Sequence, residues 1–349
     1  MNYEERVCEK IKKLFENYGF KRYKLSSFDE YSLYSENLSF FGGKDVISFS
    51  AGGKLLALRP DVTLSIIKNG RFGKDTQKLF YDEKVYRKTP NGSFAEVSQL
   101  GAEVIGNVDI LSEAELCLLA LKTLSAVGRD YVLDLSHTGA VSKIMEKLGV
   151  SDSDKKIVLR CLESKNADEF KRFAEEKKLN KDAVESIVKL MTVPSERARD
   201  VLGEISGSID LSEELKELDE IINFAANGKI NIDFSLGGDT EYYNGLFFKG
   251  YVKGVPRAVL SGGRYDGLLK KFKKGESAAG FALYLGEICK YTEDKPSRPD
   301  AVLVYGGGNA RTALIRAEKL RSEGIGLLTA REIPEGFEGE IYYAENGDD

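Results

Sequence analysis

The sequence has no tryptophan, one histidine and four cysteines among its 349 residues. One histidine, His137, excludes a metal site built on several histidines and restricts any histidine-based catalytic triad to that residue. Because His137 follows an apolar strand, we expect it to cap a helix or pack in the core. No two cysteines form the close pair that structural zinc sites use, so we expect reduced thiols and no metal. The cysteines are Cys8, Cys117, Cys161 and Cys289.

Long apolar runs and an excess of positive charge are also missing. No segment approaches the ~20 apolar residues that a membrane-spanning helix requires, and the charged residues 1–20 do not resemble a signal peptide. The formal net charge is -5, whereas chains whose main partner is nucleic acid are usually basic. We therefore predict a cytoplasmic protein whose partners include neither membrane nor nucleic acid.

Strand and helix patterns alternate in the first part of the chain. Apolar residues at helical spacing predict a helix over 4–18. Two longer stretches, 77–87 and 95–106, flank a Pro-Asn-Gly turn and predict a long antiparallel hairpin. Before this hairpin, Asp61 is placed to cap a helix over 62–69. Antiparallel strands with segregated helices are typical of an α+β architecture.

Composition divides the chain into four segments. A core in two parts, 1–138 and 229–292, is interrupted by residues 139–228, which are rich in Lys, Glu, Ala and Leu. We interpret 139–228 as a helical insertion, either a solvated subdomain or a partner contact. The core resumes with predicted strands, including one over 231–236. The last segment, 298–349, has a strand–helix–strand pattern and is shorter than a typical domain.

The second strand of the long hairpin has a polar face. Side chains alternate with period two, so Gln99, Gly101 and Glu103 share one side of the strand. A glycine between two polar groups leaves a gap where a ligand can approach the sheet. Gln99 offers an amide for an amino or carboxylate group, and Glu103 offers a carboxylate for a cation or an N–H group. The alternative is a solvent-facing strand with an incidental glycine.

Three further motifs place polar side chains at strand ends. LRPDVT puts Arg59, Asp61 and Thr63 at a strand-to-helix turn, where the last two are alternatively only a helix-capping pair. GGRYDG lacks the spacing of a phosphate-binding glycine loop. Each motif by itself is an ordinary turn. EYYNG and SGGRYDG add four side chains beside glycines, namely Tyr242, Tyr243, Arg264 and Tyr265.

Taken in order, these motifs carry a specific resemblance. LRPDVT, YR followed by QLGAEV, YYNG, GGRYDGL and GFAL together resemble histidyl-tRNA synthetase over residues 1–290. The resemblance implies a class II synthetase-like antiparallel sheet of six strands, flanked by helices, and a dimer. It also implies that histidine lies over the hairpin strand. The implied histidine-binding residues are Asp61, Thr63 and Gln99 at the amino group, Glu103 and Tyr242 at the imidazole, Arg87 at the carboxylate, and Tyr243, Arg264 and Tyr265 along the wall.

Four positions depart from that family's pattern. Ser93, Gly238 and Glu287 stand where the synthetases have arginines, and Thr89 stands where they have an acidic residue. Adenylate formation needs cations to spread the charge on the phosphates of ATP, and each lost contact costs about 3 kcal/mol. The C-terminal segment is also too short for the family's anticodon-binding domain. With Gly238 in place of an arginine, we expect Arg87 or Arg264 to face the carboxylate of histidine.

A retained pocket without catalytic cations resembles the regulatory subunits of ATP phosphoribosyltransferase. That resemblance implies a subunit with no catalytic residues and no cofactor, required by the short-form catalytic subunit for the first step of histidine biosynthesis. It implies feedback inhibition with histidine as the effector, and a self-dimer within a hetero-oligomer. Two alternatives stay open: a divergent synthetase-like enzyme that activates an amino acid, and a free-standing histidine-binding module with another partner.

Overall fold

The structure is a computed structural model with two compact units. It describes residues 3–37, 46–72, 75–89, 91–128, 130–225, 229–239 (237–239 as backbone only), 242–291, 299–306 and 310–344. The larger unit comprises Val7–Thr292, and the smaller comprises Glu293–Asp349 with Met1–Arg6. Among the described helices, none combines the length and apolar character needed to cross a membrane.

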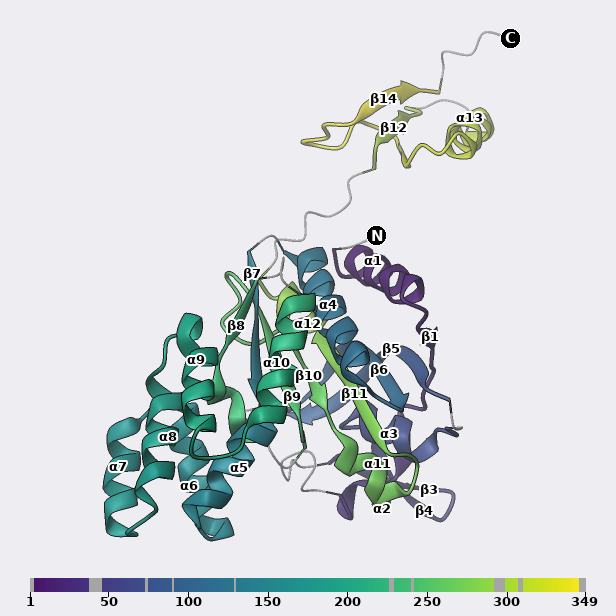
Figure 1. The fold of residues 1–349 in the computed structure, drawn as a ribbon. Coiled ribbons are helices and arrows are strands. Elements are labelled where there is room, and N and C mark those ends of the chain that lie inside the picture. Colours follow the sequence, from purple (N-terminus) through teal and green to yellow (C-terminus); the bar gives the residue numbers. More distant parts are fainter. Residues whose placement is uncertain are drawn as a thin grey trace. The chain divides into compact units, whose positions relative to one another are not determined.

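The larger unit is built on an eight-stranded sheet (Figure 1). In spatial order its strands are β1 (Lys21–Arg22), β5 (Gln77–Lys88), β6 (Phe94–Gly106), β11 (Ser277–Tyr284), β10 (Leu260–Arg264), β9 (Leu246–Val252), β7 (Tyr131–His137) and β8 (Ile230–Ile232). The strands from β5 to β7 pair antiparallel, while β1 and β8 add parallel edges. The expected synthetase-like sheet flanked by helices is thus confirmed.

One face of this sheet is covered by α1 (Tyr3–Asn17) and α4 (Ile110–Val127). The ring of Phe15 on α1 lies 5.9 Å from that of Phe80 and 5.8 Å from that of Phe281, measured between centroids. On α4, Leu124 lies so close to β9 that a Cβ on Gly250 would be 2.8 Å from its methyl groups. Burial of these large apolar side chains supplies the main stabilisation of the layer.

The opposite face is covered by shorter elements. A three-stranded antiparallel sheet is formed by β2 (Phe28–Glu30), β4 (Lys54–Leu58) and β3 (Ser48–Ala51). It packs with α2 (Tyr31–Ser35), α3 (Val62–Asn69) and α11 (Asp266–Phe272) into one apolar cluster with the β5–β6 hairpin. As predicted, Asp61 caps α3, because its carboxylate accepts a hydrogen bond from the Leu64 amide at 2.8 Å.

Helices fill the stretch between β7 and β8. They are α5 (Thr138–Leu148), α6 (Asp152–Glu163), α7 (Ala167–Glu176), α8 (Lys181–Thr192), α9 (Ser195–Ser206) and α10 (Ser212–Phe224). In Figure 1, α6 to α9 gather beyond the edge formed by β7 and β8. The boundaries expected for the insertion, 139–228, stay a prediction. His137 caps α5 as predicted, since its Nδ1 accepts from the Ala140 amide at 3.2 Å.

The strand predicted over 231–236 is wrong beyond its first two residues. Strand β8 ends at Ile232, and the 3-10 helix η2 (Phe234–Asp239) follows it. The cause is local, because the Asp233 carboxylate accepts a hydrogen bond from the Ser235 amide at 2.9 Å and turns the chain. Farther along, β11 is followed directly by the short helix α12 (Leu285–Cys289).

The smaller unit is a parallel sheet with one helix. Its strands are β13 (Leu327–Ala330), β12 (Ala301–Val304) and β14 (Glu340–Tyr343), in that spatial order, and its helix is α13 (Ala310–Ser322). The strand–helix–strand pattern expected from the sequence is present. Strand β14 was missed because its only described strand partner, β12, lies far back in the sequence.

Candidate functional site

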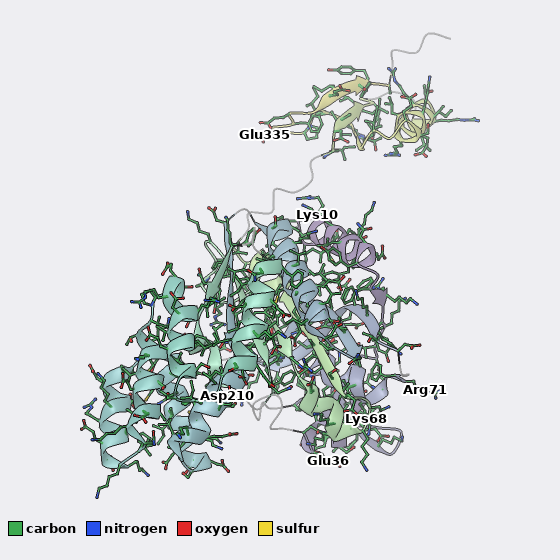
Figure 2. The ribbon with its side chains drawn as sticks, viewed as in Figure 1. Lys10, Glu36, Lys68, Arg71, Asp210 and Glu335 are labelled. Atoms are coloured by element: carbon green, nitrogen blue, oxygen red, sulfur yellow. The ribbon has the colours of Figure 1, made fainter. Side chains whose placement is uncertain are left out.

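Glu103 lies at the centre of the residues that the sequence singled out. Its side chain on β6 is 1% exposed, and both of its carboxylate oxygens accept hydrogen bonds. Thr63 donates to Oε1 at 2.7 Å, and Tyr265 donates to Oε2 at 2.6 Å. Thr63 reaches Glu103 because it lies in the first turn of α3, which the Asp61 cap fixes. Lys68, also on α3, is exposed (Figure 2).

Two glycines on neighbouring strands make room for this arrangement. Gly280 on β11 pairs with Glu103, and a Cβ there would lie 1.6 Å from Glu103 Oε2. Gly263 on β10 pairs with Gly280, and a Cβ there would lie 2.8 Å from Tyr243 Cδ1. Real Cβ atoms do not make contacts this short, so the carboxylate and the tyrosine ring occupy space that larger residues would fill.

The gap expected at Gly101 exists but holds a side chain. A Cβ on Gly101 would lie 2.3 Å from Cζ and Oη of Tyr81, its cross-strand partner on β5. Tyr81 is 1% exposed, so its ring lines the site from β5, the strand of which only Arg87 was expected at the site. The signal that identifies it is the hairpin register, which places Tyr81 opposite Gly101.

The alternative of a solvent-facing strand is wrong. Gln99 is 3% exposed and Glu103 is 1% exposed. Helix α3 and the tyrosines cover this face of β6, and an alternating pattern by itself does not reveal that both faces of a strand are buried.

Three tyrosines form an aromatic wall beside Glu103. The ring centroids of Tyr242 and Tyr243 lie 4.8 Å apart, and those of Tyr242 and Tyr265 lie 5.9 Å apart. Tyr242 also hydrogen-bonds with Thr63. Burial, with Asp61 as a second cause, raises the pKa of Tyr242 well above its usual value, so its hydroxyl keeps its proton.

Arg87 lies at the edge of the same face. Its Nε donates to the Pro60 carbonyl at 2.8 Å, and its Nη2 lies 3.5 Å from Asp61 Oδ2. Strand alternation puts Arg87 on the same side of β5 as Tyr81. Asp61 therefore joins the α3 cap to the guanidinium group, and Arg87 retains 23% exposure of its side chain.

Arg264 lies on the other face of the sheet. Its neighbour Gly263 faces Glu103 and Tyr243, so alternation directs Arg264 toward α4. There its Nη1 lies 3.2 Å from Glu113 Oε1, and its Nε donates to Asp266 Oδ2 at 2.9 Å. The structure therefore brings Thr63, Glu103, Tyr242 and Tyr265 together, with Gln99, Tyr243, Asp61 and Arg87 on the same side, and separates Arg264 from them.

The four positions that depart from the synthetase pattern place no cation on this face within the described residues. Thr89 donates its hydroxyl to the Ser93 carbonyl at 2.8 Å, which closes the hairpin tip on itself. Glu287 on α12 pairs with Lys290 at 2.6 Å. The backbone of Gly238 lies in η2, but its side-chain surroundings and residues 240–241 lie outside the described part of the chain. Within the described residues, no group of His, Cys, Asp and Glu is placed to hold a metal.

Burial links the protonation of Glu103 to the stability of the fold. Desolvation raises its pKa from 4.5 to about 8, Asp61 also raises it, and the hydrogen bonds from Tyr265 and Thr63 lower it. The unfolded state binds fewer protons than the folded state between pH 4.5 and 8, so this group makes stability fall as pH rises through that window.

Glu103→Gln is therefore expected to flatten the dependence of stability on pH. The difference in unfolding free energy between pH 5 and pH 8 should shrink by about 3 kcal/mol, as measured by urea unfolding at each pH. Glu96→Gln, an exposed change on the same strand, should leave the profile nearly as it is. A Glu103→Gln profile as steep as that of the wild type would contradict the assignment.

The chain is similar to known proteins both in sequence and in structure. The profile of the family described as histidyl-tRNA synthetase matches residues 1–288. An ATP phosphoribosyltransferase regulatory subunit from Caldanaerobacter subterraneus is 28% identical, over 92% of this chain and 88% of that protein. A histidine–tRNA ligase from Methanocaldococcus jannaschii is 29% identical, over 91% of this chain and 80% of the ligase.

Solved structures give the same fold. A protein from Bacillus halodurans, described as an ATP phosphoribosyltransferase regulatory subunit/histidyl-tRNA synthetase, superposes with a TM-score of 0.80 at 21% identity, covering 97% of this chain and 93% of that one. A chain of an ATP phosphoribosyltransferase complex from Thermotoga maritima superposes with a TM-score of 0.65 at 19% identity, covering 81% and 97% respectively.

Proposed function

The chain belongs to the histidyl-tRNA synthetase family, and from this premise we propose that it is a regulatory subunit of ATP phosphoribosyltransferase that binds histidine without activating it. A named regulatory subunit and a named ligase are about equally similar to it. These two similarities are therefore shared between the two functions, and the residues of the pocket support the regulatory one.

The observation that carries the proposal is the charge on the Glu103 face of the β5–β6 hairpin. Arg87 is the only arginine of the hairpin, and alternation places its lysines on the opposite face: Lys78, Lys84 and Lys88. Arg264 is held by Glu113 and Asp266 on the far side of the sheet. One arginine is enough for the carboxylate of an amino acid, but not for the phosphates of ATP in an adenylation transition state.

The side chains on the Glu103 face have the chemical groups that binding of histidine requires. A carboxyl group held by Thr63 and Tyr265 suits an imidazole N–H, because Glu103 keeps acceptor lone pairs whether or not it carries a proton. Asp61, Thr63 and Gln99 are placed for the amino group, and Arg87 for the carboxylate. Histidine acts as a feedback effector only if it binds two conformations of the subunit with different affinities. We further propose a cytoplasmic hetero-oligomer with the short-form catalytic subunit, in which this chain self-dimerises and uses no cofactor.

Reconstitution tests this function directly. The chain is mixed with a short-form ATP phosphoribosyltransferase from the same source, and phosphoribosyl-ATP formation is followed with and without histidine. The proposal expects activity to rise on mixing and to fall with histidine. If neither occurs, the alternatives are a synthetase-like enzyme, detected by histidine-dependent exchange between ATP and pyrophosphate, and a histidine-binding module with another partner.

Arg87→Ala is expected to weaken histidine binding by about ten- to a hundredfold, because it removes the cation that faces the ligand carboxylate. The free energy of unfolding should change by less than about 1 kcal/mol, since Arg87 is partly exposed and Asp61 keeps its cap. Titration calorimetry measures the first quantity and urea unfolding the second.

The matched control is Lys84→Ala on the same strand. Lys84 pairs with Glu96 at the surface, and the side chains are 57% and 44% exposed, so both affinity and stability should stay close to wild type. Unchanged histidine affinity in Arg87→Ala would remove Arg87 from the site.

A further inference from the structure

A chain of polar side chains crosses the face of the sheet that α1 and α4 cover. This is the face opposite to the one that carries Glu103. Its members are His137 at the end of β7, Glu217 on α10, Glu113 on α4 and Arg264 on β10. His137 Nε2 lies 3.0 Å from Glu217 Oε2, and Arg264 Nη1 lies 3.2 Å from Glu113 Oε1. Glu113 and Glu217 are neighbours, because each carboxyl group shifts the pKa of the other. Four elements that are distant in sequence thus meet in one network.

The protonation of this network follows from its geometry. His137 Nδ1 accepts from the Ala140 amide, so the ring proton lies on Nε2 and is donated to Glu217. Two like charges side by side disfavour each other, so one of the two neighbouring carboxyl groups keeps its proton. Burial and Glu217 raise the pKa of Glu113, while the hydrogen bond from His137 favours ionised Glu217 against its own burial. Glu113 is therefore the group that keeps a proton, and its Oε1 accepts from Arg264.

The same network holds the loop that carries the tyrosine wall. Arg264 and Asn244 both donate to Asp266 Oδ2, at 2.9 Å and 3.2 Å, and the Asp266 amide donates to Asn244 Oδ1 at 2.6 Å. Asn244 directly follows Tyr242 and Tyr243 in the chain.

A second tie to this loop comes from the start of α5. The hydroxyl of Thr138, the residue after His137, donates to the carbonyls of Tyr243 at 3.2 Å and Gly245 at 2.9 Å. The backbone of the tyrosine loop is therefore fixed from both sides by groups that lead back to Glu113 and His137.

We propose that Glu217 and Glu113 are positioning residues that fix the tyrosine wall of the histidine pocket against helix α10 of the 139–228 region. This proposal rests on the proposed function, because it assumes that histidine is the ligand of that wall. Helix α10, which begins two residues after Asp210 (labelled in Figure 2), supplies Glu217. A ligand that orders Tyr242 and Tyr243 orders α10 through Asn244, Asp266, Arg264 and the two carboxyl groups.

Hydrogen exchange of the full-length chain tests the link. On saturation with histidine, the amides of α10 should exchange about threefold more slowly or better in the wild type. Glu217→Gln should abolish this response, because an amide offers no negative charge to the His137 N–H and places its own donor beside it. Glu113→Gln should keep the response, because glutamine donates and accepts as the protonated Glu113 does.

Glu220→Gln on the same helix is the matched control, since Glu220 only approaches Lys216 at 3.9 Å near the surface, and it should behave as the wild type. If calorimetry shows histidine bound to the wild type and α10 does not respond, the inference falls and the proposed function stands. A Glu217→Gln variant with the full response also overturns it. If the wild type does not bind histidine, both fail. If Glu217→Gln does not fold, the response of α10 in the wild type decides whether the inference stands.

Discussion

Gly280→Ala is expected to lower histidine affinity at least about a hundredfold and to destabilise the larger unit by about 2–3 kcal/mol. The added Cβ would lie 1.6 Å from Glu103 Oε2 and 2.6 Å from the Ala102 carbonyl oxygen. The carboxylate must then leave its place, which breaks its hydrogen bonds with Thr63 and Tyr265. Titration calorimetry with histidine and urea unfolding measure the two effects.

Gly203→Ala separates this steric effect from that of glycine replacement as such. Gly203 lies in α9, and a Cβ there meets no atom within 4 Å. Alanine in a helix interior is favoured over glycine by about 0.5–1 kcal/mol, so this variant should be slightly more stable and bind histidine normally. A Gly280→Ala protein with wild-type affinity would show that Glu103 does not contact the ligand from its present position.

Arg59→Ala is expected to destabilise the protein by about 3–5 kcal/mol, the cost of removing one partner from a buried ion pair. The Arg59 side chain is 1% exposed, and its Nη2 donates to Glu83 Oε2 at 2.8 Å and to the Lys84 carbonyl at 3.0 Å. It also donates to the Ser26 carbonyl. Without it, Glu83 keeps a partly buried charge beside unsatisfied carbonyls. Urea unfolding checks the size of the loss.

Lys54→Ala is the control for Arg59→Ala. Lys54 pairs with Glu30 at 2.7 Å, but the two side chains are 67% and 61% exposed, so the change should leave stability close to that of the wild type. An Arg59→Ala protein as stable as Lys54→Ala would contradict a structural role for Arg59. The two arginines near Asp61 are thereby distinguished, since Arg59 is expected to affect stability and Arg87 affinity.

The buried carboxyl groups explain why this fold places polar residues where apolar ones would be more stable. An ion pair in the interior is often no better than a well-packed apolar pair, because both charges lose their hydration. Glu103, Glu113 and Glu217 each satisfy specific donors, so they fix the positions of particular groups on both faces of the sheet. The glycines beside Glu103 also fix the position of its carboxyl group, because they leave space that larger residues would fill.

The sequence by itself determined the family, the sheet type and the boundaries of the elements with strong local signals. The hairpin predicted over 77–87 and 95–106 is found at Gln77–Lys88 and Phe94–Gly106, and the helix predicted over 62–69 begins and ends as expected. These features depend on local periodicity and on short-range hydrogen bonds such as the cap by Asp61, which lie within a few residues of each other. The motifs, taken in their order, identified the family, because together they specify a whole sheet.

Only the tertiary structure decided which side chains share a face and which space is filled. Tyr81 occupies the gap at Gly101 because the register of the hairpin places it opposite that glycine. Arg264 lies on the face opposite to the pocket because its neighbour Gly263 has the position that faces the pocket. Glu113 meets Glu217 across more than a hundred residues of chain. Such contacts arise from strand pairing and from the packing of helices on a sheet, and no short window of sequence contains both partners.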